Sequence, residues 1–301
     1  MTPATAPALP PAVFGEVLFD CFADGARVLG GAPFNVAWHL QGLGASPVLI
    51  SAVGEDAMGD AVAASMARWG MSRAGLQRTP GHATGEVRVS LAAGQPEFDI
   101  LDARAFDHVR AADLPRIPFS MIYHGTLALR HAQSAAALDA LIEASGAPVF
   151  LDLNLRTPWW NTARIDACMR RARWVKLNHE ELAVLDGGGG GHAARAQRVR
   201  ERFGLELLIV TLAEDGALAL GEDGEQLRVP ALPAPQVVDT VGAGDGFAAV
   251  CMLALALRWP RASMLERASA FAARIVAQRG ATAEHPQLYR ALLEHWHAAA
   301  G

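Results

Sequence analysis

The stretch "PQVVDTVGAGDGFAAV" (235–250) places an acid, Asp245, directly after a Gly-Ala-Gly turn and directly before an apolar run with helical spacing. Gly242 and Gly244 allow the backbone to turn tightly and to bring its N–H groups close to a ligand. The helix that begins there adds unpaired N–H groups and the positive end of its dipole. The stretch therefore predicts an anion-binding site at a helix N-terminus that needs no cationic side chain.

Asp245 has two interpretations from its position alone. An Asp at the start of a helix is typically an N-cap or an acid that complements the helix dipole. Beside an anion site, a carboxylate can also take a proton from an alcohol while the amides of Gly242, Ala243 and Gly244 hold the phosphoryl group that the alcohol attacks. The second interpretation predicts phosphoryl transfer with Asp245 as the general base.

Two other nucleotide motifs fit the chain poorly. The dinucleotide fingerprint GxGxxG would require Gly at position 247, where the chain has Phe247, and a βαβ unit after it. An oxidoreductase is therefore disfavoured. The five glycines at 187–191 are typical of a flexible connector. A Walker A loop is excluded because it needs a lysine, and Lys176 is the only lysine in the chain.

Short apolar runs alternate with Ala-rich stretches of helical spacing, such as 56–69 and 133–144. This alternation is typical of βαβ units, and it predicts an α/β fold with a mostly parallel sheet covered on both faces. The runs are 47–53, 121–125, 148–154, 174–178 and 205–212. Ligands of such sheets bind at the carboxyl ends of the strands, where we expect Asp152, Asn154, Asn178 and Thr211.

The segment 84–101 interrupts this rhythm, because it alternates polar and apolar residues like a hairpin turning at Ala93-Gly94. We expect a small β element inserted into the α/β body and pairing with the region 15–22 or 25–31. Such an element is typical of a lid over a site or of a dimer interface.

Composition limits the class of protein. The 301 residues are 51% hydrophobic and carry a net charge of −5, so the chain can build a large core and shows no basic stripe for nucleic acid or a membrane surface. Cys21, Cys168 and Cys251 are too far apart in sequence to suggest a zinc site or a disulfide framework. With no secretion signal or membrane-spanning run, we expect a cytoplasmic protein with small-molecule ligands.

Four motifs together resemble those of the ribokinase-like, or PfkB, carbohydrate kinases. They are "GGAPFNVAWHLQGLG" (30–44), "NHEE" (178–181), "VTLAEDGAL" (210–218) and "DTVGAGD" (239–245), and they occur in the family's order. The resemblance implies one ribokinase-like kinase domain over 1–301. Its fold would be a three-layer αβα sandwich with a small β lid from about 15–31 and 84–110.

The resemblance also implies roles for the sugar-side residues. In this family the sugar lies between the carboxyl edge of the sheet and the lid. The matching hydroxyl-binding positions are Asp20, Gly30, Gly31 and Asn35. These types suit the task, since Asp and Asn side chains bind hydroxyls and glycines let a sugar ring approach the backbone. Asp245 would be the base, and the turn at 242–244 the anion hole.

On the nucleotide side, Asn178 and Glu181 match the pair that positions Mg²⁺ and its waters around ATP, with an exposed helix as the alternative interpretation. Thr211 and Gly216 resemble nucleotide-loop residues. We expect no lysine at the phosphates, so Arg156 in "DLNLR" is the candidate cation or substrate ligand, unless it forms a structural salt bridge. The loops around 237–242 and 277–281 correspond to a K⁺ site in many relatives.

The leading hypothesis is an ATP- and Mg²⁺-dependent kinase for fructose, because "GGAPFNVA", "GTLALR" (125–130) and "DLNLR" resemble fructokinases. The alternatives are 2-keto-3-deoxygluconate, ribose or a nucleoside as substrate, or a catalytically silent sugar-binding protein. Ala213 replaces the usual Gly of the nucleotide loop, and Phe34 replaces a residue that is usually small. These two departures leave the identity of the substrate undetermined. We expect a homodimer through the lid.

Overall fold

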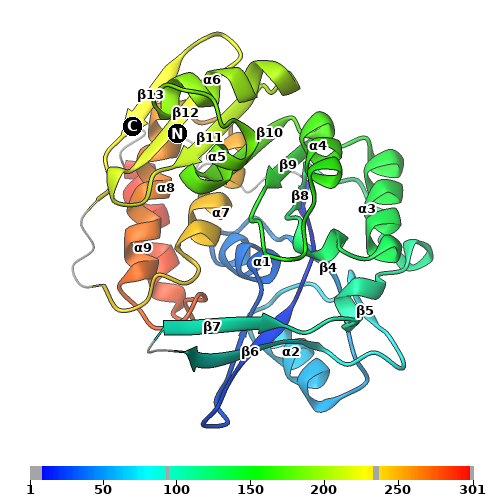
Figure 1. Ribbon diagram of the computed structural model, residues 1–301. Helices are drawn as coiled ribbons and strands as arrows, with labels where there is room; N and C mark the ends of the chain where they lie inside the picture. Colours follow the sequence, from blue (N-terminus) through cyan, green and yellow to red (C-terminus); the bar gives the residue numbers. More distant parts are fainter. Residues whose placement is uncertain (1–8, 93–94, 233–236, 299–301) are drawn as a thin grey trace.

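The computed structural model describes residues 9–92, 95–232 and 237–298. Within these ranges the strands form two sheets (Figure 1). The nine-stranded main sheet has the order β13-β12-β11-β10-β9-β8-β1-β4-β5, and the second sheet has the order β3-β2-β6-β7. The strands of the main sheet are β1 (Ala12–Phe14), β4 (Val48–Val53), β5 (Leu76–Arg78), β8 (Ile122–His124), β9 (Val149–Asp152), β10 (Trp174–Asn178), β11 (Leu207–Thr211), β12 (Ala217–Gly221) and β13 (Gln226–Val229).

The main sheet is parallel from β5 to β11. Each of the five apolar runs contains one of its strands, because a strand buried on both faces needs an apolar side chain at almost every position. β12 and β13 add an antiparallel hairpin at one edge, which the sequence analysis did not anticipate. The expected mostly parallel sheet is confirmed.

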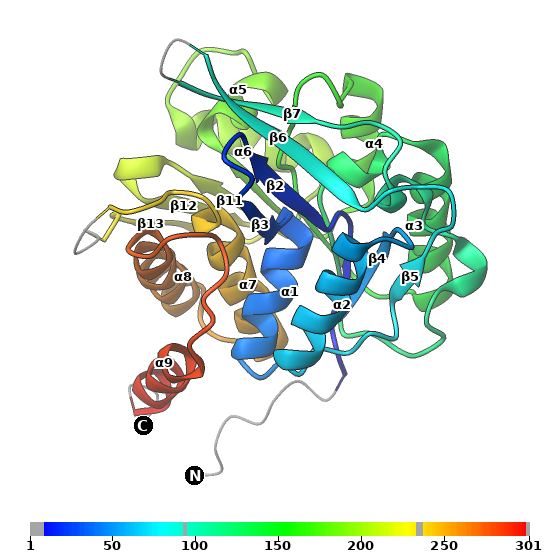
Figure 2. The same cartoon turned by 90° about the horizontal axis from the view of Figure 1, so that it is seen from below.

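Helices cover both faces of the main sheet and enclose two apolar cores (Figure 2). The first core contains residues of α1 (Ala32–Gly42), α2 (Ala57–Arg68), α7 (Ala243–Ala256), α8 (Arg261–Val276) and α9 (Pro286–Ala298). The second contains residues of α3 (Ala132–Ser145), α4 (Thr162–Arg171), α5 (His179–Leu185) and α6 (His192–Phe203). The chain therefore has the predicted three layers.

The second sheet consists of β2 (Leu18–Phe22), β3 (Arg27–Gly30), β6 (Gly85–Ala92) and β7 (Gln95–Ile100). β6 pairs with β2, so the inserted segment does join the N-terminal region as expected. β6 and β7 pair as a hairpin, but its predicted turn at Ala93-Gly94 lies outside the described residues. β2 follows shortly after the carboxyl end of β1, which attaches this sheet to the ligand-binding edge of the main sheet.

The glycine run connects α5 to α6, and Gly191 is the N-cap of α6, as expected of a connector. The three cysteines are free. Among the residues that the structure describes, no helix has the length and apolar character needed to cross a membrane.

Candidate active site

The Gly-Ala-Gly turn forms the start of α7. Gly242 is its N-cap with φ of 83°, and a Cβ atom there would lie 2.4 Å from the Cβ of Ala281, so only glycine fits. The Ala243 N–H donates to the Thr240 carbonyl over a long 3.4 Å, and the first helical hydrogen bond runs from Gly246 to Gly242 at 2.9 Å. The N–H groups between these bonds are the ones that a helix start offers to an anion.

Asp245 lies partly buried in the first turn of α7, and its side chain does not cap the helix. Instead, its Oδ2 accepts a hydrogen bond of 2.8 Å from Nδ2 of Asn35 in α1. Desolvation raises the pKa of Asp245 to about 6, against the opposing effect of the Asn35 bond. The N-cap interpretation is therefore wrong, and a pKa near neutrality suits a general base.

The four sugar-side residues lie together at the junction of the second sheet and α1. A Cβ atom at Gly30 would lie 3.7 Å from Asn35 Oδ1 and 4.0 Å from Asp20 Oδ2, so both side chains face this glycine. Gly31 has φ of 103° and approaches the Glu16 carbonyl closely. Asn35 Oδ1 is buried without a hydrogen-bond partner in the described chain. A buried acceptor without a partner is costly, and a sugar hydroxyl would satisfy it.

Lys176 in β10 is a residue that the sequence analysis set aside. Its Nζ donates to both carboxylate oxygens of Asp152 in β9, at 2.9 Å each, and only 7% of Lys176 is exposed. Nζ would also lie 3.5 Å from a Cβ atom at Gly244, so the ammonium lies against the Gly-Ala-Gly turn. The chain's single lysine is therefore a buried cation of the site. The sequence indicates such an ion pair by placing a lysine inside an apolar strand, because a buried ammonium requires an acid nearby.

Asn178 and Glu181 form a capping box at the start of α5. The Asn178 side chain accepts from the Glu181 N–H at 2.8 Å, and the Glu181 carboxylate accepts from the N–H groups of Asn178 and Leu155 at 2.9 and 2.7 Å. Glu181 is buried, so the exposed-helix interpretation is wrong. Burial raises its pKa, and Asp152 adds to this effect. The Glu181 carboxylate would act on a divalent cation through water, because both of its oxygens already accept backbone hydrogen bonds.

The two residues expected to contact the nucleotide lie at and after the carboxyl end of β11, beside Asn178 at the end of β10. Thr211 is the last residue of β11. Gly216 has φ of 90°, and a Cβ atom there would lie 2.0 Å from the Val229 carbonyl. Ala213 has φ of 50°, which explains why glycine is usual at this position. The replacement therefore keeps the turn at the cost of backbone strain.

Glu16 is a second acid that the sequence analysis missed. It is 3% exposed, and its Oε2 has no hydrogen-bond partner in the described chain. Burial raises its pKa to about 7, and the charges of Arg156 and Asp245 act on it in opposite directions. Arg156 itself is exposed and donates to the Leu155 carbonyl at 3.1 Å. Its charge also lowers the pKa of Asp245.

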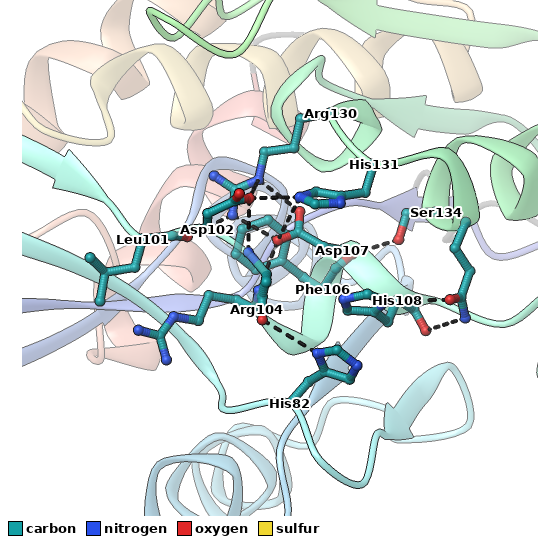
Figure 3. A network of polar contacts seen from close by, with 12 residues as sticks. His82, Leu101, Asp102, Arg104, Phe106, Asp107, His108, Arg130, His131 and Ser134 are labelled. Atoms are coloured by element: carbon teal, nitrogen blue, oxygen red, sulfur yellow. Dashed lines mark hydrogen bonds and ion pairs between the residues drawn. The ribbon is translucent and has the colours of Figure 1, made fainter.

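Figure 3 shows the polar contacts that join the segment after β7 to Arg130 and His131. Arg130, whose side chain is 2% exposed, donates to both carboxylate oxygens of Asp107, at 2.8 and 2.7 Å, and to the Leu101 carbonyl just after β7 at 2.6 Å. His131 contacts Asp102 at 2.6 Å. The polar atoms of Asp102, Asp107 and His131 lie within 4.8 Å of one another. Because the Arg130 guanidinium already neutralises Asp107, we interpret this cluster as an anchor of the second sheet.

The pKa of Asp245 predicts an acid limit to activity. The ionised carboxylate is the expected base, so kcat/KM should fall about tenfold per pH unit below about pH 6. Asp20, whose pKa burial also raises to about 6, and Glu16 titrate nearby, so a variant must identify the group. Asn35→Ala removes a hydrogen bond that lowers the pKa of Asp245 and should move the limit to higher pH. An unmoved limit in the pH profile of this variant would assign it to another group.

Comparisons with known proteins agree with this arrangement. The profile of the pfkB family of carbohydrate kinases matches residues 22–288. The fructokinase of Klebsiella pneumoniae is 30% identical over 259 residues, 81% of this chain and 83% of that protein. The aminoimidazole riboside kinase of Salmonella typhimurium is 30% identical over 273 residues, 85% of this chain and 84% of that protein. The structure of Vibrio cholerae O395 fructokinase in its fructose-, ADP- and calcium-bound form has a TM-score of 0.81 at 25% identity, covering 95% of this chain and 99% of that one.

Proposed function

Because the chain belongs to the pfkB family of carbohydrate kinases, we propose that it is an ATP- and Mg²⁺-dependent sugar kinase with fructose as its substrate. The resemblance predicted from the motifs is confirmed, and the two sheets have the ribokinase-like arrangement. One observation carries the proposal of residue roles: the Asp245 carboxylate lies beside the glycine turn and is held by Asn35, a residue of the sugar side.

In the proposed reaction the sugar hydroxyl oxygen bonds to the γ-phosphorus of ATP, and the bond to the bridging oxygen breaks to release ADP. Asp245 takes the hydroxyl proton. The amides at 242–244 stabilise the negative charge of the transferring group, and Lys176 beside them adds a positive field. Mg²⁺ held near Asn178 and Glu181 would neutralise phosphate charge. Thr211 and Gly216 would line the nucleotide.

The charges on the sugar side favour a neutral sugar. Asp20, Asp245 and Glu16 offer carboxylate acceptors to hydroxyl groups, and Asp239 is close enough to raise the pKa of Asp20. A sugar acid such as 2-keto-3-deoxygluconate would meet these charges with a carboxylate of its own. This supports fructose over a sugar acid, and fructokinases recur among the similar proteins more often than riboside or nucleoside kinases.

A K⁺ site is proposed where two loops meet. The Gly280 N–H donates to Asp239 Oδ2 at 3.1 Å, and the N–H groups of Val238 and Asp239 donate to the Val276 carbonyl. These bonds leave other carbonyl groups of the loops to bind a cation next to Gly242. A structure of the Vibrio cholerae fructokinase contains a potassium ion.

We also propose that the second sheet acts as the lid and as the dimer interface. It borders the sugar-side residues, and it carries exposed apolar side chains that a second copy would cover, namely Phe22, Val28 and Phe98.

The test is ADP release with MgATP and fructose, 2-keto-3-deoxygluconate, ribose, glucose, adenosine or inosine, in Na⁺, K⁺ and choline buffers. We expect the highest kcat/KM for fructose and faster turnover in K⁺. Preferred turnover of another compound would replace fructose but leave the kinase assignment intact. Sugar and ATP binding without turnover of any compound would favour the silent sugar-binding protein.

A further inference from the structure

His39 connects the C-terminal part of the chain to the anion-binding turn. It lies four residues after Asn35 in α1, so both side chains project from the same face of the helix. His39 is fully buried, and each ring nitrogen has a partner: Nε2 lies 2.9 Å from the Ala281 carbonyl, and Nδ1 lies 2.9 Å from the Tyr289 hydroxyl. The ring therefore bridges α1, α9 and the segment 280–283.

The partners of His39 determine its tautomer. Burial lowers its pKa to about 4, so the ring is neutral at pH 7 and carries one N–H. A carbonyl only accepts, so the proton is on Nε2 and is donated to Ala281. Nδ1 must then accept from Tyr289, whose hydroxyl lies farther, at 3.3 Å, from the Ala283 carbonyl. The Ala281 carbonyl thus sets the direction of both hydrogen bonds, and the Tyr289 hydroxyl holds the ring in this orientation through Nδ1.

Ala281 supports the turn that would bind phosphate. Its Cα and Cβ atoms lie 2.5 and 2.4 Å from the place where a Cβ of Gly242 would be, so the two backbones are in direct contact. Trp38, next to His39, donates to the Ala283 carbonyl at 2.9 Å and fixes the same segment a second time. A shift of Ala281 would therefore move Gly242, the N-cap from which the amides of the turn are oriented.

We propose that His39, oriented by Tyr289, is a positioning residue for phosphoryl transfer: it holds Ala281 against Gly242 and thereby keeps the amides of the anion-binding turn aimed at the transferring group. The same helix then positions both parts of the machinery, the base through Asn35 and the anion hole through His39. This inference rests on the proposed kinase function. Misplacement of catalytic groups by a fraction of an ångström is enough to slow an oriented reaction.

Two substitutions separate the two hydrogen bonds of His39. The amide of His39→Gln reaches the place of Nε2 and can still donate to Ala281, whereas the amide of His39→Asn reaches only the place of Nδ1. We expect His39→Asn to lower kcat about tenfold with the sugar KM nearly unchanged, and His39→Gln to keep kcat within about threefold. Amide hydrogen exchange at 238–247 should rise in His39→Asn but not in His39→Gln.

Equal losses of kcat in both variants, in proportion to their losses of thermal stability, would overturn the proposal and leave His39 as a core residue. If both variants fold poorly, Tyr289→Phe removes only the hydroxyl and should still raise exchange at 238–247 and lower kcat; unchanged values would overturn the proposal as well. The exchange measurement needs no turnover. Failure of the kinase function would appear separately, as absence of turnover by the wild-type chain.

Discussion

Asp245→Asn is expected to lower kcat about 10³-fold while sugar and ATP still bind, because Asn cannot take the proton of the sugar hydroxyl. The Asn carbonyl can still accept the hydrogen bond from Asn35. The stability of the fold should not decrease. The folded-state pKa of Asp245, about 6, lies above its ordinary value of 3.8, so its contribution to stability is lost as the pH rises through 6. At pH 7 the neutral Asn should leave the melting temperature unchanged or raise it.

This combination distinguishes the base from a helix cap. Loss of a cap costs about 1 kcal/mol of stability and has no reason to abolish the chemical step. Binding is measured by calorimetry, kcat by ADP release and stability by thermal unfolding. Asp60→Asn is a matched control, because Asp60 lies exposed in α2 in an ion pair with Arg78, and it should change none of the three. A variant that is less stable but keeps its kcat would show that Asp245 only complements the dipole of α7 and that another group is the base.

The positions of the reacting groups follow from local patterns in the sequence. The glycines before Asp245 indicate a helix start with free N–H groups, and apolar runs indicate the strands whose carboxyl ends hold Asn178 and Thr211. The β12–β13 hairpin was missed because β12 begins inside the motif segment 210–218 and β13 has only four residues, two of them polar. Local patterns were sufficient wherever a residue's role depends on its own turn or helix.

What the sequence could not predict are contacts between distant segments. Asn35 and Asp245 are 210 positions apart, and only the packing of α1 against α7 brings them together. The sequence analysis expected no lysine at the phosphates, because Lys176 lies outside any Walker A motif. A motif says nothing of the neighbouring strand that supplies Asp152, so the pairing of Lys176 with Asp152 could not be predicted. The oxygens of Glu181 are occupied by backbone N–H groups, a feature that depends on the loop after β9. Each of these findings depends on the fold, not on local propensity.

These contacts bring several like charges close together in the site. Asp152, Glu181 and Asp245 bring three carboxylates to the same sheet edge, and Lys176 is the cation buried among them. Asp152 and Glu181 also raise its pKa, so the ammonium stays charged although burial alone would lower that value. The charge of Lys176 therefore affects the stability of the fold, through its ion pair with Asp152, and the pKa of the proposed base, Asp245. The two effects can be measured separately.

Lys176→Met should destabilise the fold by about 3–5 kcal/mol, because it leaves the Asp152 carboxylate buried without its cation. Urea unfolding at pH 7 measures this loss. Lys176 also lowers the pKa of Asp245, so the acid limit of kcat/KM should move to higher pH in the variant. Arg68→Met is the control, because Arg68 lies exposed in α2, where it donates to the Ser65 hydroxyl and pairs with no acid among the described residues. It removes a charge from α2 and should change neither quantity.

The double variant Lys176→Met/Asp152→Asn tests the explanation, since it removes both charges and keeps an acceptor for the Tyr123 hydroxyl. Most of the lost stability should return, because a neutral pair does not carry the desolvation cost of an isolated ion. The acid limit should also return towards the wild-type position, because Asp152 raises the pKa of Asp245 and Lys176 lowers it. A double variant as unstable as the single one would mean that Lys176 stabilises the strand by packing. An acid limit that stays in place in all variants would mean that Lys176 does not act on the base.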